Sequence, residues 1–230
     1  MDFDSLVRTA EAIGLDAVAI TDHDTIEGAL EFQRLARGKG LDLQIIAGEE
    51  KTLSDGSHLI GLFLQKHIEF GDLRQAIPEI EDQGGFCLVP HPFRRTDGLL
   101  RDGLERIKLF EGRTAGFELF NAKSSFAENQ KARDLLSSSL GPFGGSDAHY
   151  DCDLGESLNV LGWQTDLKTS VQLMLQRKMP SHIMGKLQPE GAPERAYAPL
   201  YYRYRKRFRL PKTLVPLART ARTTSGPSAV

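Results

Sequence analysis

The protein has 230 residues, of which 40% are hydrophobic and 26% charged, as expected for one large globular domain with a sizeable core. No apolar run approaches the roughly 20 residues that a membrane span needs, and residues 1–4 have neither the basic nor the apolar region of a secretory signal. The two cysteines, Cys87 and Cys152, form no C-x-x-C pair. The composition therefore predicts a cytoplasmic protein without a disulfide framework or a thiolate zinc site.

The net charge of −2 conceals two regions of opposite charge. Nine of the 29 Lys/Arg and none of the 31 Asp/Glu lie from Arg195 onward, so this segment carries +9 and the rest −11. We expect one domain over residues 1–187 and a basic, partly disordered extension over 188–230. Its stretch Tyr201 to Arg209, YYRYRKRFR, could bind nucleic acid through charge and stacking. We favour docking onto the acidic body, either within one chain or between subunits.

Apolar spacing and Gly/Pro breaks predict alternating helices and strands along the first 180 residues. Phe3, Leu6, Ala10 and Ile13 share a helical face that ends at Gly14. Further helices are predicted over residues 26–36, 73–83, 100–110, 125–136 and 167–176, and strands over 16–20, 43–47, 58–64, 86–89, 116–120 and 159–163. This alternation predicts an α/β fold with a parallel sheet, open or closed as a barrel.

Polar side chains follow several of the predicted strands. Asp22 and His23 come directly after a strand, as do Glu50 and His91. Chemistry in parallel α/β folds gathers at these carboxyl ends. Four of the six histidines lie near element ends and are accompanied by three acids: His23, His58, His91 and His149, with Asp22, Glu50 and Asp147. Imidazole and carboxylate without thiolate suit Zn²⁺, Mn²⁺ or Fe, and clusters of such ions suit phosphoester hydrolysis.

Six motifs occur in the order and rough spacing of the polymerase-and-histidinol-phosphatase (PHP) family of metal-dependent phosphoesterases. They are TDHDT at 21–25, GEE at 48–50, HLIGL at 58–62, HPFR at 91–94, ELFN at 118–121 and GSDAH at 145–149. The chain resembles that family over about residues 1–180. The resemblance implies a distorted barrel of seven β-α units, with up to three divalent metal ions bound at the carboxyl ends of the strands.

The resemblance also implies roles for individual residues. Glu50 would bridge two metals, with His58 and His91 completing one of them and Asp147 the other. His23 and His149 would bind the third metal. Asp22 would orient neighbouring ligands, and Arg94 and Asn121 would contact phosphate. Glu50, Asp147 and Asp22 are therefore the expected catalytic residues.

The opening His-x-His strand of the family has no counterpart in this sequence, which begins instead with a predicted helix. One predicted metal would then lack two histidines, and another its carboxylate. We hypothesise that Met1 is an internal methionine of a longer natural protein. Translation of the codons upstream tests this, because an early stop codon without an in-frame His-x-His would contradict it.

Other polar residues receive ordinary structural interpretations. Asp24 is either a turn or helix-cap residue before the second helix or a residue that orients ligands. Asp55 and Gly56 predict a turn. The residues predicted to be solvated loop acids or to have no role in the site are Glu49, His67, Asp151, Cys152, Asp153 and His182.

The sequence predicts a phosphoesterase in which metal-bound hydroxide attacks a small phosphomonoester, a nucleotide or the end of an oligonucleotide. One alternative is a non-catalytic, N-terminally incomplete module that binds a single metal. A weaker alternative is an amidohydrolase-type enzyme, against which the motif order speaks.

Overall fold

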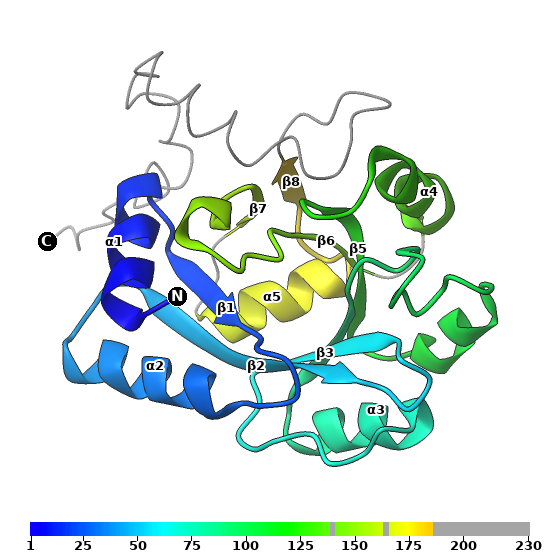
Figure 1. The fold of residues 1–230 in the computed structure, drawn as a ribbon, viewed down its shortest axis with the longest axis horizontal. Helices are drawn as coiled ribbons and strands as arrows, with labels where there is room; N and C mark the ends of the chain where they lie inside the picture. The colour runs from blue at the N-terminus through cyan, green and yellow to red at the C-terminus, as the bar shows by residue number, and fades with distance from the viewer. Residues whose placement is uncertain (139–140, 163–165, 186–230) are drawn as a thin grey trace, which may run out of the picture.

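The computed structural model describes residues 1–138, 141–162 and 166–185 (Figure 1). The predicted extension over 188–230 and the end of the strand predicted over 159–163 lie outside these ranges. The helices are α1 (Phe3–Ile13), α2 (Glu27–Gly38), α3 (Leu73–Asp82), α4 (Phe126–Leu136) and α5 (Leu167–Leu175), with 3-10 turns η1 (Glu105–Phe110) and η2 (Asp151–Asp153). The strands are β1 (Ala17–Ile20), β2 (Gln44–Thr52), β3 (His58–Leu62), β4 (Phe86–Val89), β5 (Ala115–Asn121), β6 (Gly141–Gly145), β7 (Ser157–Leu161) and β8 (Ser181–Gly185).

Six strands form one curved sheet in the order β1-β2-β3-β4-β5-β6, and β7 pairs with β8 in a second, two-stranded sheet. Strand β3 runs antiparallel to both of its neighbours, whereas the other pairs of the large sheet are parallel. The predicted parallel sheet is therefore confirmed for three of its pairs and wrong for β3. A parallel pair needs a crossover of a dozen or more residues, and only residues 53–57 connect β2 to β3.

The connection between β2 and β3 is the turn predicted at Asp55 and Gly56. Gly56 has φ 77°, which a glycine adopts without steric cost. The Asp55 carboxylate accepts hydrogen bonds from the backbone N–H and the hydroxyl of Ser57, at 3.0 and 2.6 Å. The turn therefore fixes the register that places Glu50 opposite Ile60 and Thr52 opposite His58.

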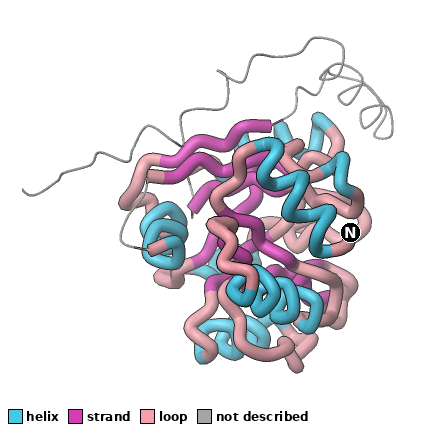
Figure 2. Tube along the Cα trace, turned by 90° about the vertical axis from the view of Figure 1, so that its left-hand side faces the viewer, coloured by secondary structure: helices cyan, strands magenta, loops and turns pink. Residues whose placement is uncertain are grey.

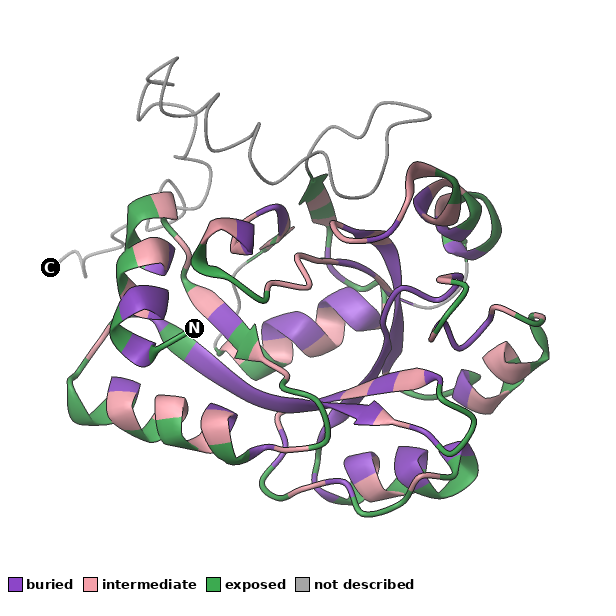
Figure 3. Cartoon of the chain, in the orientation of Figure 1, coloured by how far each residue is buried: buried purple, intermediate pink, exposed green. Residues whose placement is uncertain are grey.

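Both faces of the curved sheet are covered. Helices α2, α3 and α4 lie outside the curve, and α5 lies within it (Figure 1). The view in Figure 2 shows the same arrangement from the side, with helices around the strands. Successive side chains of a strand point to opposite faces, so Ile46 packs with α5 residues while Ala47 belongs to the outer core. Most residues of the central strands are buried (Figure 3).

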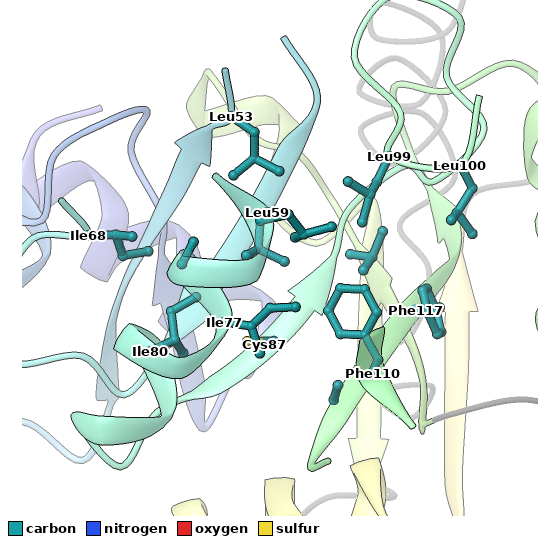
Figure 4. Close-up of a cluster of buried hydrophobic side chains, with 14 of the residues drawn as sticks. Leu53, Leu59, Ile68, Ile77, Ile80, Cys87, Leu99, Leu100, Phe110 and Phe117 are labelled. Carbon is teal, nitrogen blue, oxygen red and sulfur yellow. The ribbon is translucent and has the colours of Figure 1, made fainter. Parts of the chain in front are cut away.

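The outer core joins α3 to the middle of the sheet. Ile77 and Ile80 of α3 are at most 2% exposed and belong to the same buried cluster as Leu59, Phe110 and Phe117 (Figure 4). Phe110 and Phe117 meet edge to face, with ring centroids 5.6 Å apart, a preferred aromatic geometry. This core supports the strands from outside and leaves their carboxyl ends available for polar groups.

Helix α1 confirms the predicted opening helix and its end. The Asp2 side chain accepts a hydrogen bond from Ser5 N at 2.8 Å, and Gly14 adopts φ 75° at the C-terminal end of the helix. The helix packs against β1 and β2 through Phe3, Leu6 and Ala10. No helix in the described part of the chain is long and apolar enough to cross a membrane.

Several predicted helix and strand bounds differ from the structure, at places where glycine or charged residues interrupt the apolar spacing. The helix predicted over 100–110 is reduced to η1, because Gly103 has φ 156° and interrupts it. Strand β6 is Gly-Pro-Phe-Gly-Gly, a composition in which neither glycine nor proline signals a strand. Strand β2 extends past the predicted residue 47 through Gly48, Glu49 and Glu50. Strand β8 was not predicted.

Candidate metal centre

The loop after β1 continues alongside β2 and brings His23 to Glu50. Glu50 N donates to Asp22 O at 3.1 Å, and Asp24 N donates to Glu50 O at 3.0 Å. His23 and Glu50 are consequently bridge partners beyond the end of β1. Asp24 has φ 51°, a strained conformation for a residue with a side chain. Its carboxylate accepts a hydrogen bond from Thr52 N at 3.0 Å and so anchors the loop to β2.

Three imidazoles surround the Glu50 carboxylate. His58 Nδ1 lies 2.8 Å from Glu50 Oε1, and His91 Nε2 lies 3.1 Å from the same oxygen. His23 Nε2 lies 4.0 Å from Glu50 Oε2. These side chains come from the loop after β1, the start of β3 and the segment after β4. His23, Glu50 and His58 offer ligand atoms within 4.8 Å of one another, so the structure brings four of the predicted ligands together.

A second group of potential ligands adds an acid that the sequence motifs do not indicate. His58, His91 and Asp97 also offer atoms within 4.8 Å of one another. Asp97 Oδ1 lies 3.3 Å from His91 Nδ1, and the Asp97 carbonyl accepts a hydrogen bond from His58 N at 3.0 Å. Asp97 lies in an irregular loop six residues after His91. No spacing rule connects these positions, so only the folded loop reveals the contact.

The imidazoles keep the Glu50 carboxylate charged. Burial by itself raises the pKa of Glu50, but the hydrogen bonds from His58 and His91 outweigh burial and hold this pKa well below its usual value. Burial lowers the pKa of His91, but the hydrogen bond to Glu50 and the negative charges of Glu118 and Glu50 together outweigh burial, so the net shift is upward. The centre thus combines a buried anion with imidazoles whose protons a divalent cation can replace.

The predicted ligands Asp147 and His149 lie in a different arrangement. Arg94 Nη2 donates to Asp147 Oδ2 at 2.6 Å and to Asn121 Oδ1 at 2.8 Å. Burial raises the pKa of Asp147, but the charge of Arg94 and its hydrogen bond together outweigh burial and lower this pKa. His149 Nδ1 faces the carbonyl oxygen of Asp147 at 3.0 Å, and 61% of the His149 side chain is exposed. The two close ligand groups found among the described residues contain neither Asp147 nor His149.

The PHP domain model matches residues 1–139, which is more than half of the chain. This chain belongs to the PHP domain family. An uncharacterized protein of Methanocaldococcus jannaschii is 34% identical over 119 residues, which cover 51% of this chain and 65% of that protein. The chain thus spans just under two thirds of this relative.

Two solved structures share the PHP fold with this chain. One is a two-domain protein from Bacteroides vulgatus that contains a predicted PHP-like metal-dependent phosphoesterase, with TM-score 0.57, 22% identity, and 77% of this chain and 59% of that chain covered. The other is endonuclease Q in complex with a 27-mer duplex that carries an abasic lesion, with TM-score 0.58, 14% identity, and 82% and 55% covered. The curved six-stranded sheet is consistent with a PHP-type barrel.

Glu118 connects the Glu50 and Asp147 parts of the candidate site, a contact that the sequence did not indicate beyond the place of Glu118 at a strand end. Its buried carboxylate accepts hydrogen bonds from His91 N and, at 3.0 Å, from Asn121 Nδ2. Burial raises the pKa of Glu118 to about 7. The opposite strand makes room for it, because a Cβ on Gly145 would lie 1.8 Å from Glu118 Oε1.

Asp22 and Asn121, two further residues expected at the site, differ in burial and in their contacts. Asp22 is exposed, and its carboxylate lies against the first turn of α2, where a Cβ on Gly28 would meet it at 2.9 Å. Asn121 is 2% exposed, and its Oδ1 accepts hydrogen bonds from Lys123 N and Ser124 N as well as from Arg94.

Two predictions of solvated loop acids are wrong. Glu49 is completely buried on the sheet face opposite Glu50, and it accepts hydrogen bonds from His67 Nδ1 and Ile68 N, both at 3.0 Å. Asp153 is 1% exposed and accepts hydrogen bonds from His149 N and Tyr150 N, both at 3.1 Å. Side-chain alternation along β2 sends consecutive acids to opposite faces, and the loop after β6 folds back over Asp153.

Proposed function

We propose that this PHP domain is a metal-dependent phosphoesterase. The observation that carries the proposal is the single buried carboxylate of Glu50, approached by His23, His58 and His91 from three separate elements. Burying a charged carboxylate among several imidazoles carries a desolvation penalty that ion pairing alone often fails to offset. It is a suitable ligand set for a divalent cation.

The residues present fit such a cation. His91 Nδ1 and Asp97 Oδ1 are buried atoms without a hydrogen bond, which is uncommon in a folded protein. We propose His23, Glu50, His58 and His91 as the first ligands, with Asp147 and His149 available for further ions. Bound Mn²⁺, Zn²⁺ or Fe would supply Lewis acidity and a nucleophile at neutral pH.

The protein groups around the centre bind and orient the substrate. The site has two halves, one around Glu50 and one around Asp147. Arg94 is a cationic side chain that pairs with Asp147, and Asn121 holds its guanidinium group. We propose that Arg94 binds the phosphoryl oxygens. Because Asn121 is buried and fully bonded, its role is to position Arg94. A histidine that binds metal cannot also protonate the leaving group, so water or an unliganded side chain does so.

The substrate class follows from these groups and from the related structures. A guanidinium beside a metal centre suits a small phosphomonoester, a nucleotide or the end of an oligonucleotide. Endonuclease Q, which shares the fold, is complexed with a DNA duplex, and this supports a nucleic-acid substrate as one option. The basic stretch at 201–209, which could add nucleic-acid contacts, lies outside the described residues.

Hydrolysis of a generic aryl phosphate tests the proposal. We expect activity that Mn²⁺ stimulates and a chelator removes, and loss of that activity in Glu50→Gln, because the substituted side chain has the same shape but no charge. Glu111→Gln is the control, because Glu111 is exposed and belongs to neither group of close ligands. Activity of Glu50→Gln equal to that of the parent would refute the assignment. Binding of one ion or none, without hydrolysis, would instead support a non-catalytic module.

A further inference from the structure

Asp97 occupies a place in the site that no family motif assigns to it. The loop from His91 to Leu100 folds back through hydrogen bonds from Arg94 N to His91 O at 2.9 Å and from Leu100 N to Pro92 O at 2.8 Å. Gly98 permits this fold, because a Cβ there would lie 2.6 Å from backbone atoms of Arg94 and Pro92. The fold returns the Asp97 carboxylate to the His91 ring.

The two nitrogens of His91 face two different carboxylates. Nε2 lies 3.1 Å from Glu50 Oε1, and Nδ1 lies 3.3 Å from Asp97 Oδ1. The ring is 2% exposed, so water does not compete freely for either nitrogen. Neither Nδ1 nor Asp97 Oδ1 forms a hydrogen bond in the described part of the chain, and Arg94 Nη1 lies farther from Asp97 Oδ1, at 3.9 Å. Each is therefore the natural partner of the other.

The backbone of His91 is also constrained. His91 has φ 27°, an unfavourable conformation for a residue with a side chain, and its N–H donates to Glu118. A ligand that is held at its backbone and at one ring nitrogen presents the other nitrogen in a single direction. Metal-binding histidines characteristically donate their second N–H to a carboxylate or carbonyl, which fixes the ring and its tautomer.

We infer that Asp97 is a positioning residue for His91, whose Nδ1–H donates to the Asp97 carboxylate while Nε2 is presented to the cation held with Glu50. This inference rests on the proposed metal-binding function. The carboxylate acts through His91 and is not itself a ligand. Its backbone carbonyl also accepts a hydrogen bond from His58 N, a contact that does not involve the Asp97 side chain.

Titration of the full chain with Zn²⁺ alone tests the inference. We expect Asp97→Ala to weaken Zn²⁺ binding by about 10- to 100-fold, and Asp97→Asn, which keeps an acceptor oxygen, to weaken it less. Asp102→Asn is the control, because this neighbouring acid is 87% exposed and pairs with Arg101. In a His91→Ala background, Asp97→Ala should cause no further loss. An additional loss there would show that Asp97 is a ligand and overturn the inference.

Nuclear magnetic resonance provides a readout that a general loss of structure does not imitate. With ¹⁵N-labelled histidine, the His91 Nδ1 proton should be slow to exchange and shifted downfield in the parent with and without Zn²⁺, and should disappear in Asp97→Ala. Its persistence in Asp97→Ala would contradict the inference. A parent that binds no Zn²⁺ but shows this proton would refute the proposed function while supporting the contact between Asp97 and His91.

Discussion

Glu50 and Asp147 are both expected metal ligands, and their side chains are almost equally buried, at 10% and 13% exposed. Their partners differ. Imidazoles surround Glu50, whereas a guanidinium and an amide hold Asp147. An imidazole can give up its proton and become a metal ligand, but a guanidinium stays charged and offers no lone pair. The first carboxylate is thus arranged for a cation, and the second already has one in Arg94.

This difference gives the two halves of the site different costs of metal binding. A cation at Glu50 displaces only protons, because its ligands are already close together. A cation at Asp147 must compete with Arg94 for the carboxylate. We therefore expect the first ion to bind at Glu50, and an ion at Asp147 to bind more weakly, with Arg94 released toward the substrate.

The largest expected effect separates these two carboxylates directly. Glu50→Gln should reduce affinity for the first Mn²⁺ by more than the roughly 100-fold that loss of an outer partner costs, because the central ligand loses its charge. Asp147→Asn should leave the first binding constant within about 3-fold and weaken only later ions. Isothermal titration of both variants measures this. Equal losses would show that both carboxylates hold the same first ion.

A smaller effect should appear when Arg94 is replaced by methionine. Asp147 would then be buried without a counter-charge, which should lower the free energy of unfolding by about 3 kcal/mol. Saturating Mn²⁺ should restore part of this loss, because a cation can take the place of the guanidinium. Urea unfolding with and without Mn²⁺ is the measurement.

Arg34→Met is the matched control for Arg94. Arg34 is 72% exposed and pairs with Glu31 at 4.0 Å, so its loss should change stability by less than about 1 kcal/mol, with or without metal. Similar losses in both variants would mean that the Arg94–Asp147 pair is no more important than a surface ion pair.

Much of the fold follows from local sequence patterns. The apolar spacing of α1 and its Gly14 end, the strand Phe86–Val89 and the Ser125 start of α4 all lie where the patterns predict them. The direction of β3 does not follow, because period-two alternation reads the same in parallel and antiparallel strands. The short turn at Asp55 and Gly56 indicates the antiparallel direction, because so short a connection cannot join parallel strands.

The candidate site was predicted in part for a related reason. Motifs placed His23, Glu50 and His91 after predicted strands, and parallel strands end side by side. His58 stands at the start of β3 and reaches the site because β3 runs antiparallel. Asp97 and Glu118 were missed because their partners are set by a folded loop and by the space over Gly145. Glu49 was misread because the alternation of β2 continues through its charged residues.

Glu118 of β5, which lies beside Gly145 of β6, contacts both the Glu50 part and the Asp147 part of the site and so allows both to be tested together. Gly145→Ala would push Glu118 away from His91 N and Asn121 Nδ2, and we expect a loss of about 2 kcal/mol from overpacking. Both halves of the site should be affected, so the affinities for the first ion and for later ions should fall together. Thermal unfolding and Mn²⁺ titration measure the two effects.

Gly38→Ala is the control for this substitution, because nothing lies within 4 Å of a Cβ at Gly38 in α2; it should be neutral or slightly stabilising. If Gly145→Ala does not fold, Glu118→Gln tests the same contacts without added volume. Weakening of only one half of the site by Glu118→Gln would contradict the connecting role.

The smallest expected effect concerns the hairpin that delivers Glu50 and His58. Burial raises the pKa of Asp55, but hydrogen bonds from Ser57 and the charge of Arg106 outweigh burial and lower it to about 2. A folded pKa below the unfolded one stabilises the protein above the unfolded pKa, and this contribution disappears as the pH falls from about 4 to 2. Asp55→Asn should therefore lower the free energy of unfolding by about 1 kcal/mol at pH 6, allowing for solvent screening of a partly exposed pair, and by less as the solution is acidified.

Urea unfolding across this pH range measures the difference in stability between parent and variant, with Asp102→Asn as the exposed control. A difference that stays constant with pH would show that the hairpin, and with it the register of Glu50, does not depend on the charge of Asp55.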